Sequence, residues 1–121
     1  MLLVAIILLL MIGVIHSYLG EKYLLIRLFR RKDLPKLLGS DLFTKRILRF
    51  AWHLTTIAWW GFAAILSVLI TPNNDINNEI LLIICVVFTS SGILSLYFSH
   101  GKHLSWLFFF IIAFAAYYSV I

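Results

Sequence analysis

Four histidines are the side chains of this chain best suited to chemistry. They are His16, His53, His100 and His103, and the sequence has no other histidine. Imidazole nitrogen is a good ligand for transition metals and the common axial ligand of haem iron. His100 and His103 stand only three residues apart, in the stretch Ser99–His103. Whether the four could share one centre depends on the elements that carry them.

The composition predicts that these elements are membrane helices. The chain has 121 residues, of which 63% are hydrophobic and 12% charged, more apolar surface than a small soluble domain can bury. A membrane helix needs about 20 apolar residues, and we expect one all-α integral membrane domain over residues 1–121, a four-transmembrane-helix bundle. The predicted spans are about 2–22 (with an extension towards residue 29), 47–70, 80–99 and 103–121. In the third, Ser91, Ser95 and Ser99 form a stripe suited to helix packing.

Charge placement predicts the orientation. Nine of the ten Lys and Arg residues lie between Lys22 and Arg49, and the connection 73–79 has none. By the positive-inside rule, the basic loop 27–46 is cytoplasmic and both termini are on the trans (periplasmic) side, in a bacterial inner membrane. Within this loop, residues 33–38 fit either a short interfacial helix or a solvated loop. The same clustering argues for the lipid bilayer as partner and against nucleic acid, despite the net charge of +5.

This topology predicts that the four histidines lie in one layer. With ~1.5 Å of rise per residue, His16 is ~9 Å and His53 ~7 Å below the cytoplasmic boundary, and His100 and His103 flank that boundary. If Ser99 began the last helix, the latter two would share one helix face. We therefore expect His16, His53, His100 and His103 to be the ligands of a metal site.

Glu21 is a further candidate ligand. It follows His16 by five residues, ~140° round an α-helix, so it would need a kink at Gly20 to join the same centre. Otherwise it would accept a hydrogen bond from a histidine or pair with Lys22. Tyr18 and Glu21 are the candidate catalytic residues.

Two interpretations give this centre a redox function. In the first, it holds one or two transition-metal ions; iron, copper and manganese are favoured and zinc is compatible. The chain would then be an oxidoreductase acting on an oxygen species or a quinone. In the second, His16 and His53 hold haem b, and four helices around such a haem are similar in architecture to small membrane b-type cytochromes.

A third interpretation is non-enzymatic: a small transporter or an assembly factor. The histidines would then be structural, hydrogen-bonded between helices to Ser17, Thr55, Thr56 or Tyr18. The monomer has no ionisable residue from Leu2 to Ile15 or from Leu54 to Ile70, so a transport path would require a homodimer.

Overall fold

The computed structural model is all-helical over the residues that it describes, 2–71 and 75–121. The first helical rod consists of α1 (Leu2–Leu19), the π-helix η1 (Gly20–Leu25) and α2 (Ile26–Leu28). It is followed by α3 (Asp41–Ile70), α4 (Ile76–Ser99) and α5 (Ser105–Tyr118). The rod Leu2–Leu28, α3 and α4 are each long and apolar enough to cross a membrane. These features fit a membrane protein, as the composition predicts.

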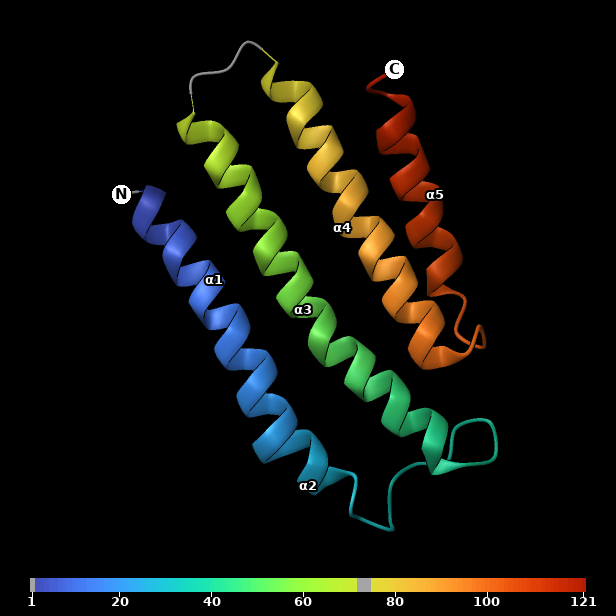
Figure 1. Cartoon of the computed structure of the whole chain (residues 1–121). Helices are drawn as coiled ribbons and strands as arrows, with labels where there is room; N and C mark the ends of the chain where they lie inside the picture. The colour runs from blue at the N-terminus through green and yellow to red at the C-terminus, as the bar shows by residue number, and fades with distance from the viewer. Residues whose placement is uncertain (1, 72–74) are drawn as a thin grey trace.

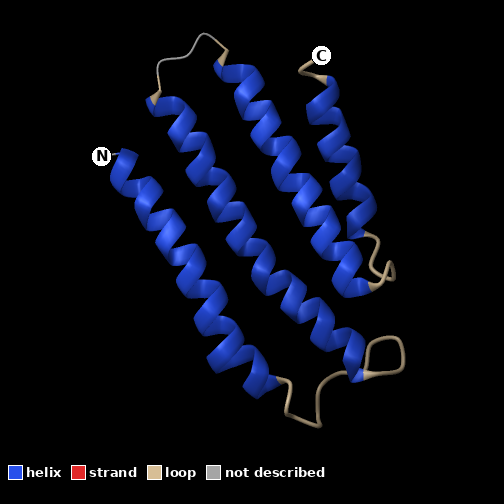
Figure 2. Ribbon diagram, in the orientation of Figure 1, coloured by secondary structure: helices blue, strands red, loops and turns tan. Residues whose placement is uncertain are grey.

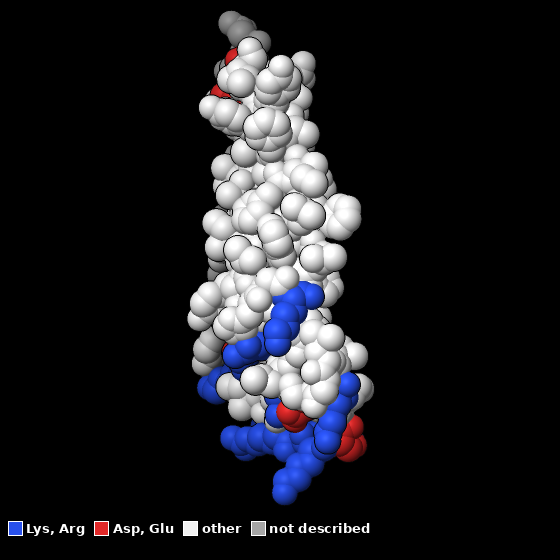
Figure 3. Space-filling view, turned by 90° about the vertical axis from the view of Figure 1, so that its right-hand side faces the viewer, with Lys and Arg blue, Asp and Glu red and all other residues white. Residues whose placement is uncertain are grey.

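The helices pack in the order in which they occur in the chain (Figures 1 and 2). α1 contacts α3, α3 contacts α4, and α4 contacts α5. Among the described residues, α1 has no Cα atom within 8 Å of α4 or α5. The arrangement is compatible with a four-helix bundle, but it is an open one, and the slim outline in Figure 3 agrees with a single layer of helices. Most large apolar side chains are therefore exposed, as they would be towards lipid.

The helix bounds differ from the predicted spans mainly at the ends. The first helix reaches Leu28, close to its expected extension, whereas α3 and α4 each begin several residues early, at Asp41 and Ile76. α5 is shorter than predicted, because residues 101–104 form the turn before it and residues 119–121 leave the helix after it. Its 14 residues extend about 21 Å, less than the ~30 Å of a bilayer core.

Residues 31–40, between the first rod and α3, contain no helix, so the predicted short interfacial helix over residues 33–38 is not formed and the segment is a loop. Leu38 and Gly39 both have positive φ, at 54° and 85°, and turn the chain back before α3. Thr44 of α3 fixes this turn by donating a hydrogen bond to the carbonyl of Pro35, at 2.5 Å. Lys and Arg side chains gather at this end of the molecule, far from both termini (Figures 1 and 3).

The serine stripe of α4 packs as predicted. Ser91, Ser95 and Ser99 are all buried, and the Ser95 hydroxyl is 2.5 Å from the Ser105 hydroxyl of α5. Gly92 lies against the Phe110 ring, where a Cβ atom would be 2.8 Å from Cε1. The α4–α5 contact therefore depends on small and hydroxyl side chains, which let two helix backbones approach in lipid.

Candidate functional site

Two glycines of the first helical rod let it pack closely on α3. A Cβ atom at Gly13 would be 2.3 Å from Nε1 of Trp60, and one at Gly20 would be 1.9 Å from Nε1 of Trp52. The space beside these two glycines is therefore occupied by two indole rings. Each indole also donates a hydrogen bond to the backbone of α1. Trp52 donates to the His16 carbonyl at 3.0 Å, and Trp60 donates to the Leu10 carbonyl at 3.4 Å.

The π-helix η1 begins where Trp52 contacts the first rod. The Trp52 indole donates to the His16 carbonyl, which in a regular α-helix accepts from the N–H of Gly20. A side chain that enters the hydrogen-bond ladder is a recognised cause of such a distortion, and π turns are frequent at functional sites. The helix irregularity that Glu21 was expected to need at Gly20 is therefore present. It directs the Glu21 side chain towards α3.

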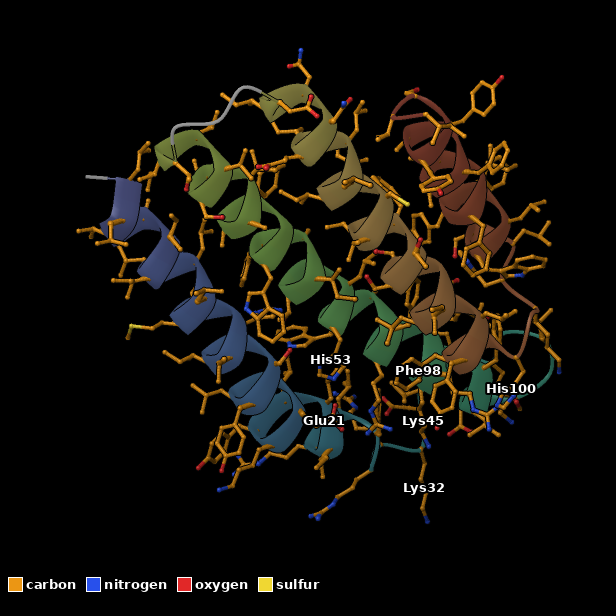
Figure 4. The ribbon with its side chains drawn as sticks, turned by 45° about the horizontal axis from the view of Figure 1, so that its top comes forward. Glu21, Lys32, Lys45, His53, Phe98 and His100 are labelled. Carbon is orange, nitrogen blue, oxygen red and sulfur yellow. The ribbon has the colours of Figure 1, made fainter. Side chains whose placement is uncertain are left out.

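Glu21, Arg49 and His53 form a cluster between η1 and α3, which we call the carboxylate cluster. Arg49 binds Glu21 with two groups, Nη2 at 2.6 Å from Oε1 and Nε at 3.2 Å from Oε2. The Nε2 atom of His53 is 3.1 Å from the same Oε2. Figure 4 shows Glu21 and His53 facing each other. Their side chains and that of Arg49 are 25–35% exposed, so an external ligand can reach them.

The second nitrogen of His53 continues the network into the helix interface. Nδ1 lies 2.9 Å from the hydroxyl of Ser17, which lies 2.7 Å from the hydroxyl of Thr56. Thr56 is buried, and its hydroxyl lies 3.4 Å from the carbonyl of Gly13. Because an ionised carboxylate only accepts hydrogen bonds, Nε2 of His53 carries a proton, and Nδ1 accepts from Ser17 when the ring is neutral. When Ser17 donates to Nδ1, it can only accept from Thr56, whose one proton then serves Ser17 rather than the more distant Gly13 carbonyl. In that arrangement hydrogen bonds lead from the carboxylate through His53 and Ser17 to the buried Thr56.

His16 has a separate environment on the same helix pair. Its Nε2 is 2.8 Å from the Thr55 hydroxyl and 3.3 Å from the Trp52 carbonyl. Thr55 donates its own proton to that carbonyl, so Nε2 of His16 is the donor. The ring stacks on Trp52, with centroids 4.4 Å apart and planes 4° from parallel, and meets the edge of Trp59 at 4.9 Å. His16 is thus held between aromatic rings.

His100 and His103 lie at the turn between α4 and α5, apart from the carboxylate cluster. His100 ends α4 in the left-handed conformation, with φ 49°, and is exposed; Figure 4 shows it beside the end of α4. His103 precedes α5, and its Nδ1 is 2.7 Å from the Ser105 hydroxyl. Since α5 begins at Ser105, the two histidines do not share a helix face, as they would if Ser99 began that helix.

Of the predicted site residues, the structure brings together Glu21 and His53 only. Over residues 2–71 and 75–121, no group of three or more His, Cys, Asp or Glu side chains is placed to hold a metal ion. Tyr18 is exposed and accepts a hydrogen bond from Lys22 at 3.2 Å, so Lys22 turns to Tyr18 and Glu21 to Arg49. The hydrogen bonds of His53 to Ser17 and of His16 to Thr55 are among the interhelical hydrogen bonds that the non-enzymatic interpretation predicts for structural histidines.

Arg49 is the one residue of the carboxylate cluster that was not predicted as a site residue; in the sequence it counted only as part of the basic cluster from Lys22 to Arg49. Its spacing carried a signal: it precedes His53 by four residues, which places both on one face of α3. A partly buried carboxylate such as Glu21 also favours a cationic partner, and Arg49 is the cation on that face nearest to His53 in the sequence.

Comparison with known proteins assigns no family to this arrangement. No protein-family model, curated protein or solved structure matches the chain.

Proposed function

We propose that the chain is an inner-membrane protein that binds the head group of a lipid-soluble quinone at the carboxylate cluster. In this proposal, the cluster supplies protons to the quinone when a separate electron carrier reduces it. The observation that carries the proposal is the contact of His53 Nε2 with Glu21 Oε2 at 3.1 Å, inside a hydrogen-bonded network at a helix interface. Ionisable residues within membrane helices are costly, and they commonly mark substrate sites or proton relays.

The charge of the cluster favours an uncharged head group with acceptor atoms. Glu21 and Arg49 neutralise each other, so with a neutral His53 ring the cluster carries no net charge and has little attraction for a phosphate. Arg49 has five N–H donors, and two of them bind Glu21. The other three can donate to a quinone carbonyl oxygen, which is a neutral acceptor.

An apolar groove that begins one turn beyond His53 along α3 fits the apolar part of such a ligand, although none of the three cluster residues lines it. It lies between α3 and α4 and has a volume of about 490 Å³. Its α3 wall includes Ile57, Trp60 and Ala64, which follow His53 by four, seven and eleven residues. These spacings place His53 on the same helix stripe, at the end nearer the basic loop. A quinone could therefore place its head at His53 and its apolar tail along the groove.

The hydrogen-bond chain fits the supply of protons. In the proposed step His53 acts as an imidazolium: it gives its Nε2 proton to the reduced quinone and keeps the Nδ1 proton as a neutral ring. Glu21, which contacts Nε2 and is partly exposed on the loop side, then takes a proton from water and passes it to Nε2, and so returns to the carboxylate form. On the other nitrogen, Ser17 and Thr56 can reverse the direction of their hydrogen bonds, since each hydroxyl both donates and accepts. In this proposal the basic loop is cytoplasmic, and the protons come from the cytoplasm.

The test is quinone binding by matched histidine variants. A short-chain quinone is titrated into the protein in lipid nanodiscs, and quenching of tryptophan fluorescence gives the Kd. His53→Gln should raise the Kd about tenfold, as expected for the loss of one hydrogen bond. His103→Gln, remote from the cluster, should leave it unchanged. Equal Kd values for the wild type and His53→Gln would refute the proposal.

A second candidate function is the binding of a transition-metal ion by Glu21 and His53. The specific observation is their separation of 3.1 Å, because two ligand atoms of a tetrahedral ion lie about 3.3 Å apart. With only two protein ligands, the ion would keep open positions for water or substrate. Elemental analysis tests this: His53→Ala should lose a metal that His103→Ala retains, and metal-free wild-type protein would exclude it.

A further inference from the structure

A second polar site lies on the lipid-facing side of η1, away from the carboxylate cluster. The Lys22 ammonium is 5.3 Å and the Arg27 guanidinium 5.7 Å from the centroid of the Tyr23 ring. Lys22 also donates a hydrogen bond to the hydroxyl of Tyr18 and lies 5.4 Å from that ring. Two cations are thus held around one aromatic ring, within the range of cation–π attraction.

The π turn explains why these two cations meet. Lys22 and Arg27 are five residues apart, which in an α-helix would separate them by about 140°. Lys22 lies in η1 and Arg27 in α2, and in the π-helical part the hydrogen bond spans five residues instead of four, which brings residues five apart closer to one line along the rod. The same irregularity that turns Glu21 towards α3 therefore aligns Lys22 and Arg27 on the outside of the rod.

Neither cation has an acidic partner in the described part of the chain. Glu21, the nearest carboxylate in the sequence, binds Arg49 and His53. Asp33 and Asp41 bind Arg31 and Lys45. Lys22 and Arg27 are left with ring contacts to tyrosine and the Lys22–Tyr18 hydrogen bond, and both are exposed. Two aligned cations without a counter-ion form a site for an anion.

The surroundings identify the kind of anion. Tyr18 and Tyr23 are 59% and 50% exposed, and tyrosines are typical of the headgroup level of a membrane. The α1 surface above them, towards the N-terminus, presents exposed apolar side chains such as Ile15 and Leu19. An anion at Lys22 and Arg27 would thus continue into an apolar surface. We propose that this site binds the phosphate group of an anionic phospholipid, whose acyl chains lie along α1.

The proposal is independent of the quinone site, and lipid binding tests it directly. The protein in detergent is titrated with phosphatidylglycerol or phosphatidylcholine, and native mass spectrometry counts the lipids retained. The wild type should retain phosphatidylglycerol in preference to phosphatidylcholine. The double variant Lys22→Gln/Arg27→Gln should lose that preference by about tenfold or more, since each basic residue near an anionic surface contributes about fivefold.

The matched control removes the same charge elsewhere at the same end. Lys32→Gln/Lys36→Gln should keep the preference, and Arg27→Lys should keep most of it because the charge remains. An equal loss in both double variants would overturn the proposal, as would a wild type without preference. Millimolar inorganic phosphate should not displace the lipid; full displacement would indicate a free-phosphate site and also overturn the proposal.

Discussion

Two helix interfaces of this molecule use small residues in the same way but differ in what else they contain. Between α1 and α3, Gly13 and Gly20 admit tryptophan rings, and between α4 and α5, Gly92 admits a phenylalanine ring. The first interface also contains histidines and hydroxyls and adjoins an ion pair. The second has a hydroxyl pair at the end where α5 begins, and His103 contacts the Ser105 hydroxyl of that pair.

The difference indicates which interface serves more than packing. Hydroxyls and glycines are enough to hold two helices together in lipid, as α4 and α5 demonstrate. Charged groups add a desolvation cost that packing does not require. The Glu21–Arg49–His53 cluster therefore calls for an explanation in function, and variants of the two interfaces should separate the two roles.

The largest difference in stability between the two interfaces is expected when Gly20 and Gly92 are each replaced by alanine. Gly20→Ala places a Cβ atom at 1.9 Å from Trp52 Nε1, and Trp52 is held by its stack on His16 and its hydrogen bond. Overpacking should cost about 2–3 kcal/mol there and about 1 kcal/mol for Gly92→Ala. Thermal unfolding in detergent measures both. A larger loss in Gly92→Ala would reverse the comparison.

The next effect concerns the ion pair. Arg49→Gln leaves the Glu21 carboxylate without its bidentate partner and should cost about 1–2 kcal/mol, below the value for a fully buried pair because both side chains are about one-third exposed. Lys45→Gln, which breaks the Lys45–Asp41 pair at 2.8 Å, is the control and should cost about 0.3–0.5 kcal/mol.

A double-mutant cycle with Glu21→Gln isolates the Arg49–Glu21 coupling. If Glu21→Gln restores none of the stability lost in Arg49→Gln, the pair is not coupled as the distances indicate.

A smaller effect is expected from single hydroxyls. Ser17→Ala and Ser95→Ala should each cost about 0.6 kcal/mol, a typical value for a hydrogen bond between membrane helices. They should differ in a second measurement, because only Ser17 contacts the His53 ring. The ¹⁵N resonance of His53 Nδ1 should move in Ser17→Ala and stay in Ser95→Ala. Movement in both would mean that the two interfaces are not independent.

The smallest effect is expected in the loop at the same end. Arg31 lowers the pKa of Asp33 below its usual 3.8 through a hydrogen bond and its charge. Any stability from this lowering is present above pH 3.8 and is lost as the pH falls through the lowered pKa. Because the pair is fully exposed, Asp33→Asn should leave the Tm unchanged at pH 7 and at pH 3. A clear shift at pH 7 would show that the loop contributes to the fold.

Composition and charge predicted the helices well, because apolar length and basic clustering are properties of local sequence. The serine stripe of α4 was also predictable from its period of four residues. The positions of the histidine side chains were not predictable in this way. The depth of a residue in the membrane does not determine to which side of its helix the side chain points. The π turn at Gly20 arises from a tertiary contact with Trp52, and it gives Glu21 a direction that no helical period indicates.

The order of packing was equally hidden in the sequence. Four apolar helices are compatible with a closed bundle or an open row, and hydrophobicity does not distinguish lipid from another helix as a neighbour. In an open row His103, beside α5, lies on another helix pair from His53 and Glu21, so a common layer does not create a common site.

The most direct test of the account is the response of the four histidines to quinone. In protein with ¹⁵N-labelled histidine, reconstituted in bilayers, His53 should carry its proton on Nε2, which faces Glu21. Addition of a short-chain quinone should shift the His53 resonances and leave those of His100 and His103 in place. An unmoved His53, with quinone bound, would contradict the assignment of the carboxylate cluster as the site.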